Sequence, residues 1–351
     1  MNRKKVLPAA ILVLGLVILL FAGIRAYRFC YDRKAPNFKG GVEFYVYPGM
    51  EASAVLDTLV ASGEVKSEES LRRTFRREGA MDSMKPGHYR LDATCSSTYA
   101  ARMLRKGWQS PVNLVLSGAI RSPKVLARKI GAKMLVDSAE VASFIYSNDS
   151  LRRYGVDTTL LFTLVIPDTY EILWTASVRE IMDRLKAESD AFWTEERLAA
   201  ARAQGLTRAQ AVTLASIVDG ETNYVPEQPT VAGVYLNRLH RGMKLQADPT
   251  IAYCFGYTLS RILKSHLQVD SPYNTYMYAG LPPGPISCPP KSCIEAVLHP
   301  AAHSYIFFCA DPSFNGSHRF ATTYSEHLDN ARAFQRALTE RQRQRRMQGN
   351  S

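Results

Sequence analysis

The stretch Thr207-Arg-Ala-Gln-Ala-Val-Thr-Leu-Ala-Ser-Ile-Val-Asp-Gly-Glu-Thr222 decides the fold of the larger part of this chain. It predicts a helix, because Thr207 can cap the N-terminus and Gln210 can complete a capping box. Apolar residues then follow on a wide face, which indicates a helix that is largely buried. Two acids, Asp219 and Glu221, stand at the end of this predicted core helix.

The helical period gives these two acids different environments. Glu221 follows Val218 by three residues and Ile217 by four, so it continues the apolar face. Asp219 lies about 200° around the helix from Glu221, so the two should not form a close pair. Burial disfavours a charged carboxylate, and a raised pKa is what a general acid needs. An exposed glutamate near a helix end is the ordinary alternative, and periodicity alone favours it.

The N-terminus predicts a membrane anchor. Val6 to Ile24 is an uncharged stretch of 19 residues, which at about 1.5 Å per residue just spans a hydrocarbon core. A cleavable signal peptide is the alternative, but the stretch is long for one and no clear cleavage site precedes Arg25. Basic residues lie on both sides of the span, so charge does not orient it.

The segment after the span predicts small α+β units. Val42 to Tyr47 is typical of a strand, two helical patterns follow, and residues 85–91 return to extended structure. This βααβ order is similar to a LysM-type module, a small fold that binds N-acetylated glycans. The order strand, helix, helix, extended segment recurs over residues 112–172. The two closing segments, from Pro86 and from Pro167, both read Pro-x-x-Tyr-x-apolar.

The composition and the absence of known motifs limit which partners and cofactors the sequence predicts. The 351 residues are 46% hydrophobic, enough for a sizeable core, and the net charge of +12 favours anionic partners. Dispersed charge and the anchor argue against nucleic acid. No HExxH, Walker or G-x-G-x-x-G motif occurs, so neither a metal nor a cofactor is predicted. Among six cysteines, Cys288 and Cys293 can bridge in an oxidising compartment.

A series of longer motifs resembles the endolytic murein transglycosylase family, also called YceG-like or MltG. The motifs occur in the order Leu214–Thr222, Val231–Leu239, Gly242–Thr250, Ser271–Tyr276, Gly280–Ile286 and Ala296–Pro300. The family's first stretch usually reads Ile-Val-Glu-Lys-Glu-Thr, with the second acid catalytic. Carried over, that acid is Glu221, while Asp219 and Gly220 depart from the usual residues.

The resemblance implies an enzyme that cleaves peptidoglycan strands internally. Protonated Glu221 would donate to the oxygen of the β-1,4 bond between N-acetylmuramic acid and N-acetylglucosamine. The carboxylate would then take the proton of the muramic acid C6 hydroxyl, which attacks C1 and leaves a 1,6-anhydro end. The expected substrate-binding residues, whose amides, phenols and acids suit sugars, are Asp219, Asn237, Gln246, Asp248, Tyr273, Asn274, Thr275 and Tyr276.

The fold expected is α+β, with a helical anchor, a LysM-like region and a catalytic domain. The expected parts are 1–24 (cytoplasmic start and anchor), 25–41 (juxtamembrane linker), 42–110 (LysM-like), 111–176 (second α+β segment, possible repeat), 177–340 (YceG-like catalytic domain, starting with one helix over 177–203) and 341–351 (basic tail). The catalytic domain would lie outside the cytoplasmic membrane, with peptidoglycan synthases as implied partners. A hydrolase that uses Asp219 to activate water and a silent glycan-binding scaffold remain as alternatives.

Overall fold

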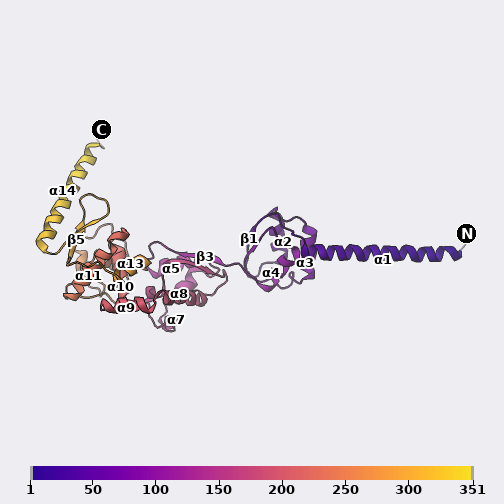
Figure 1. Cartoon of the computed structure of the whole chain (residues 1–351), viewed down its shortest axis with the longest axis horizontal. Helices are drawn as coiled ribbons and strands as arrows, with labels where there is room; N and C mark the ends of the chain where they lie inside the picture. The colour runs from indigo at the N-terminus through magenta and orange to yellow at the C-terminus, as the bar shows by residue number, and fades with distance from the viewer. Residues whose placement is uncertain (1–2, 349–351) are drawn as a thin grey trace. The chain divides into compact units, whose positions relative to one another are not determined.

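Residues 3–348 are described by the computed structural model as a mixed α+β chain that divides into two compact units (Figure 1). The N-terminal unit comprises the chain up to Asn113 together with Glu171–Thr175. The C-terminal unit comprises Leu114–Tyr170 and the chain from Ala176 onwards. The outermost residues of the predicted anchor and tail, 1–2 and 349–351, lie outside the described residues. The elements of the N-terminal unit are α1 (Arg3–Lys34), β1 (Val42–Val46), α2 (Ala52–Ala61), α3 (Glu68–Arg77), β2 (Gly87–Leu91) and α4 (Ser97–Lys106).

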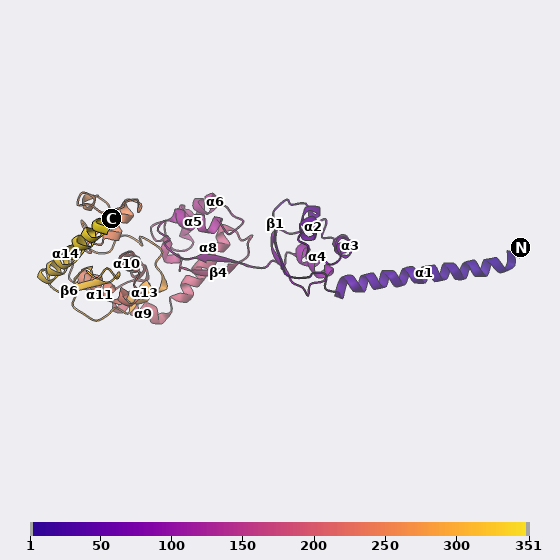
Figure 2. The same cartoon turned by 90° about the horizontal axis from the view of Figure 1, so that it is seen from above.

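Within α1, the segment Ala10–Lys34 is long and apolar enough to cross a membrane, and it is the one such segment among the described residues. It is compatible with a single-pass anchor. The helix does not stop at Ile24, so the first ten residues of the predicted linker are helical. Figure 2 shows α1 as one continuous helix. Asp32 explains the continuation, because its buried carboxylate accepts hydrogen bonds from Ser70 (2.6 Å), Arg73 (2.7 Å) and Arg77 (2.9 Å).

The predicted βααβ order is present in the N-terminal unit. Strands β1 and β2 pair antiparallel, with Val42 opposite Leu91 and Val46 opposite Gly87. Helices α2 and α3 lie between them in the chain, and α4 follows. Their apolar faces share one core, in which Leu59, Leu71 and others are fully buried. Burial of these faces is what stabilises such short helices, since isolated ten-residue helices are marginal in water.

The C-terminal unit contains the helix from which the sequence argument began. Its elements, taken with the strand β3 that enters it, are β3 (Val112–Leu116), α5 (Pro123–Gly131), α6 (Ser138–Ile145), α7 (Asn148–Arg152), η1 (Leu161–Leu164), β4 (Asp168–Ile172), α8 (Val178–Phe192), α9 (Glu195–Ala203), α10 (Arg208–Glu221), η2 (Val225–Glu227), α11 (Gln228–His240), α12 (Asp248–Cys254), η3 (His266–Gln268), α13 (Lys291–Leu298), β5 (Phe307–Ala310), β6 (His318–Ala321) and α14 (Tyr324–Gln348). Strand β3 pairs with β4, and β5 pairs with β6.

Helix α10 forms the centre of this unit. Its capping box, Thr207 with Gln210, is formed as predicted. Every residue from Ala211 to Val218 is buried, and α10 packs against both α11 and α13. Burying several aliphatic side chains completely, at about 1.5 to 3 kcal/mol each, fixes the end of α10 firmly. The wide apolar face therefore predicted a true core helix.

One expectation for a helix boundary was wrong. The single helix expected over 177–203 is two helices, because Trp193 turns into the core and Thr194 caps α9 with its side chain. Helix α14 runs without a break from the expected catalytic domain into the expected basic tail. The six cysteines are all free, and Cys288 instead donates from its thiol to the Val165 carbonyl at 3.2 Å.

Candidate active site

Glu221 is the last residue of α10 and is half-buried. Its Oε1 accepts a 2.5 Å hydrogen bond from the phenol of Tyr235 on α11. Burial raises the pKa of Glu221 to about 7, the bond from Tyr235 opposes that rise, and the nearby charge of Asp248 adds to it. A carboxyl with this pKa holds and releases its proton near neutral pH, which is the requirement for a general acid/base.

Asp219 has a separate environment on the same helix. Its Oδ2 accepts a hydrogen bond from the Ser287 hydroxyl at 3.0 Å. Burial raises the pKa of Asp219 as well, while the bond from Ser287 and the charge of Arg121 lower it. The two acids of α10 thus hydrogen bond to different partners, in agreement with their different faces on the helix.

Gly220, between the two acids, allows α12 to approach α10 closely. A Cβ at this position would lie 2.5 Å from Cβ of Pro249, closer than real side chains come. Pro249 is the second residue of α12, and Asp248 is the first. The close approach therefore positions Asp248 near Glu221, where its carboxylate accepts a 2.6 Å bond from the phenol of Tyr276.

Glu221 lines two cavities at once. One, of about 230 Å³, also contains Arg121, Asp219, Asp248, Tyr257 and Ser287. The other, of about 690 Å³, is formed by Glu221 with Thr222–Tyr224, the loop around Phe314 and side chains of α14. A long polymer would find room in both directions from the same carboxyl.

Several predicted binding residues brace loops near the site. The buried amide of Asn274 donates to the carbonyls of Leu267 (3.0 Å) and Val269 (2.7 Å). Thr275, also buried, accepts from the Ala247 amide at 3.0 Å. Asn237 donates to the carbonyls of residues 303 and 305. These bonds use much of the hydrogen-bonding capacity of the three side chains. Direct contact of these side chains with sugar stays a prediction.

The other predicted residues are placed differently. Asp248 lies at the cavity and is exposed, with the phenol of Tyr276 on its carboxylate. The ring of Tyr273 packs on Tyr253 at 4.5 Å between centroids. Gln246 has a positive φ of 49° and an exposed side chain, and its Oε1 lies 3.4 Å from the guanidinium of Arg238.

Comparison with known proteins shows the family and the fold of the chain. The model of the YceG-like family matches residues 44–333 of the chain. The chain belongs to the YceG-like family. Its fold is similar to that of a YceG-like protein from Listeria monocytogenes, with a TM-score of 0.55 and 24% identity over 83% of this chain and 99% of that one.

Two bacterial relatives carry the name endolytic murein transglycosylase. The Bacillus subtilis protein is 41% identical over 116 residues, which cover 33% of this chain and 32% of that protein. The Streptococcus pneumoniae protein is 24% identical over 350 residues, which cover 89% of this chain and 62% of that protein. The chain thus spans about three fifths of the streptococcal relative.

Three residues of this YceG-like site were missed by the sequence argument. Tyr235 was overlooked because only the packing of α11 on α10 brings it to Glu221. Arg238, buried in α11, donates to the carbonyls of Ile306 (2.6 Å) and Leu245 (2.7 Å). The sequence signal that could have found Arg238 is a cation between two apolar residues, Leu236 and Leu239, because a buried cation needs partners. Arg121 comes from the loop before α5, and no local pattern indicated it.

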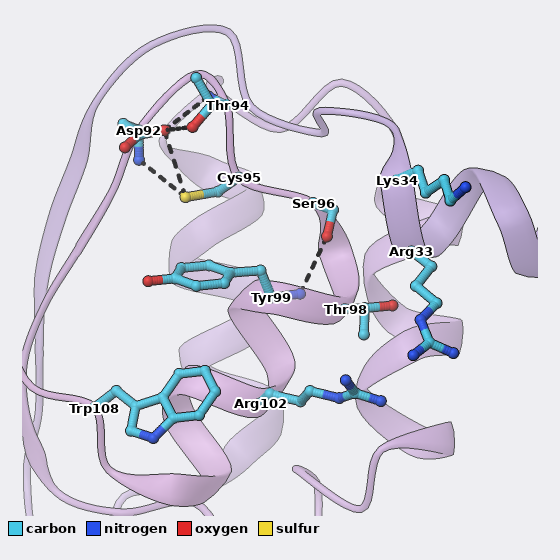
Figure 3. A pocket seen from close by; sticks show the side chains of 10 residues that line it. All are labelled: Arg33, Lys34, Asp92, Thr94, Cys95, Ser96, Thr98, Tyr99, Arg102 and Trp108. Atoms are coloured by element: carbon cyan, nitrogen blue, oxygen red, sulfur yellow. Dashed lines mark hydrogen bonds between the residues drawn. The ribbon is translucent and has the colours of Figure 1, made fainter.

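A further cavity lies in the N-terminal unit of this YceG-like chain, beside two exposed aromatic rings (Figure 3). It measures about 560 Å³. The rings of Tyr99 and Trp108 are about half exposed, with centroids 6.0 Å apart. The cations Arg33, Lys34 and Arg102 lie on the same cavity. Rings beside cations are suited to sugar faces that carry carboxylates.

Proposed function

We propose that this protein is a lytic transglycosylase that cleaves peptidoglycan glycan strands internally, with Glu221 as its acid/base. The observation that carries the proposal is the environment of Glu221. It is a half-buried carboxyl whose pKa burial raises to about 7, and it lies on two cavities. The names of the bacterial relatives support the same activity.

In the proposed mechanism, protonated Glu221 gives its proton to the oxygen between C1 of N-acetylmuramic acid and N-acetylglucosamine. That C1–O bond breaks, and the C6 hydroxyl oxygen of the same muramic acid bonds to C1. The hydroxyl proton passes to the Glu221 carboxylate, which restores the acid. No water is consumed. One carboxyl suffices because the nucleophile belongs to the substrate and is already close, whereas ordinary glycosidases use two.

Other residues of the site have proposed supporting roles. Tyr235 holds Glu221 in one orientation through its 2.5 Å bond. Asp248, braced by Tyr276, faces the cavity where it can accept from sugar hydroxyls. Arg121 lines the same cavity and can pair with the carboxylates that muramic acid and its peptides carry. The two cavities on Glu221 support cleavage within a strand rather than at its end.

The N-terminal unit has its own proposed part in this function. Its βααβ order and the Tyr99 and Trp108 rings beside the 560 Å³ cavity support a LysM-like, glycan-holding role. Helix α1 would anchor the chain in the cytoplasmic membrane with both units on the outer side, where peptidoglycan lies. Peptidoglycan synthases in the same membrane are proposed partners, and strand termination or trimming the proposed role.

The test is digestion of purified glycan strands by the full chain in detergent, with mass spectrometry of the products. A Glu221→Gln variant serves as the inactive form. Glu196→Gln, at an exposed position on α9, serves as a matched control. Internal fragments with 1,6-anhydro ends are expected from the wild type and the control and not from Glu221→Gln.

Two outcomes would redirect the proposal. Reducing ends in place of anhydro ends would mean a hydrolase, and Asp219→Asn would then be the next variant. Cleavage that persists in Glu221→Gln, or is absent from the wild type, would contradict the assignment of Glu221 and favour a glycan-binding scaffold.

A further inference from the structure

A large cavity in the N-terminal unit lies between α1 and α3 and has no part in the proposed reaction. It measures about 1040 Å³. Its apolar lining comes from α1, through Phe21, Ile24 and Phe29. Its polar lining is dominated by arginines from both helices: Arg25, Arg28, Arg72, Arg73, Arg76 and Arg77.

Helix α3 carries four arginines in its last six residues. Arg72 and Arg76, and likewise Arg73 and Arg77, are four residues apart, a spacing at which like charges destabilise a helix. The apolar face of α3, with Leu71, is buried in the core. The arginines are therefore gathered on the remaining face, where Glu68 and Glu69 pair with Arg72 and Arg73 one turn later.

Acidic side chains of the protein pair with several of the cavity's arginines. Asp32 accepts from Arg73 and Arg77, and Glu69 lies 3.4 Å from Arg28. Asp57 and Glu68 pair with Arg72, and Glu69 also pairs with Arg73. Among residues 3–348, Arg25 and Arg76 have no ion-pair partner, and both are exposed.

The position of the cavity along α1 identifies the kind of anion. Ile24 ends the uncharged stretch, so Arg25 and Arg28 fall at the level of lipid headgroups if α1 spans a membrane. Phe21 and Ile24, one turn earlier, face the same cavity at the level of acyl chains. An occupant that fits both ends has a phosphate at one end and hydrocarbon at the other.

We propose that this cavity binds an anionic phospholipid, with its phosphate between Arg25 and Arg76 and its acyl chains along Phe21 and Ile24. Guanidinium groups bind phosphate oxygens through paired, charge-assisted hydrogen bonds. Basic residues next to a span attract anionic lipids. The site rests on α1 as an anchor and is independent of Glu221.

The experiment places the full chain in nanodiscs of equimolar phosphatidylglycerol and phosphatidylcholine. Native mass spectrometry then counts the lipids that the released protein retains. The wild type should retain phosphatidylglycerol in preference. Each of Arg25→Gln and Arg76→Gln should lower that preference about fivefold, and the double variant about 25-fold. The Arg25→Lys and Arg76→Lys double variant, which keeps the charge, should retain most of it.

The controls separate this site from general charge and from catalysis. Arg336→Gln with Arg343→Gln removes the same charge from exposed positions of α14 and should leave the preference unchanged, as should Glu221→Gln. The proposal is overturned if the wild type retains both lipids equally, if the α14 variant loses as much as the cavity variant, or if inorganic phosphate displaces the lipid.

Discussion

Glu221 acquires its chemistry from its own burial and from two neighbours on other helices, Tyr235 and Asp248. The buried end of α10 raises its pKa, Tyr235 counteracts the rise, and Asp248 strengthens it. Because these effects oppose one another, single substitutions should move the pKa of Glu221 in predictable directions. The proposed cleavage of glycan strands can report that movement.

Activity should fall as the pH rises above about 7, because the acid form of Glu221 starts the proposed reaction. Tyr235→Phe removes the bond to the carboxylate, so the alkaline limb of the kcat/KM profile should move to higher pH. Asp248→Asn removes a negative charge, so the limb should move to lower pH. Profiles of strand cleavage would check both, and shifts in the same direction would contradict this account.

The same pKa predicts a dependence of stability on pH. The folded protein holds the Glu221 proton up to about pH 7, against 4.5 for an ordinary glutamate. The proton on Glu221 therefore stabilises the folded protein by up to about 3 kcal/mol. This stabilisation is fully present below pH 4.5 and is lost as the pH rises through 7. The difference in unfolding free energy between Glu221→Gln and wild type should therefore increase over that range. Denaturation of Glu196→Gln should parallel the wild type, and a constant difference for Glu221→Gln would refute the assigned pKa.

At the scale of elements, the contact between α10 and α12 rests on the missing side chain of Gly220. Gly220→Ala should improve helix propensity by about 1 kcal/mol, yet its Cβ would meet Pro249 at 2.5 Å. We expect a net loss of stability of about 1 to 2 kcal/mol by overpacking, and a clear loss of cleavage as Asp248 moves. Thermal unfolding and kcat/KM would check this.

A matched control for that change is Gly205→Ala, where the strain comes from a φ of 73° and no atom lies within 4 Å of the added Cβ. It should lower stability without changing cleavage by the folded protein. A Gly220→Ala variant with wild-type activity would show that the spacing of α10 and α12 does not matter for the reaction.

Elements whose signals are local could be predicted from sequence, and those set by distant packing could not. The cap at Thr207 and the apolar run after it predicted α10 and placed Glu221 on its apolar face, whereas the catalytic role of Glu221 came from the family resemblance. The break at Trp193 was missed because its cause is burial of that ring in the core. Tyr235 was missed for the same reason, since the site needs the packing of α11 on α10. Asn274 and Thr275 were predicted to bind substrate, whereas their hydrogen bonds to nearby loops depend on the folded chain.

At the scale of the whole molecule, Asp32 joins the anchor to the N-terminal unit. Asp32→Asn would leave Arg73 and Arg77 without their buried carboxylate, which should cost about 2 kcal/mol after allowance for their partial exposure. Thermal unfolding should show the loss, and trypsin should cut faster after Arg33 and Lys34. Asp149→Asn, which breaks an exposed pair with Arg152, should change neither. Equal behaviour of the two variants would mean that Asp32 does not hold α1.

The unbroken course of α1 from the apolar stretch into the N-terminal unit has a consequence for where the protein can work. The ten residues from Arg25 to Lys34 add about 15 Å of helix beyond the span. A disordered segment of the same length would act as a tether and let the unit swing at varying heights. In the proposed anchored protein, a helix held by Asp32 fixes the height of the N-terminal unit above the bilayer. For the proposed transglycosylase, the part of the cell wall within reach would then be set by diffusion of the whole protein in the membrane, and strands close to the membrane would be met first.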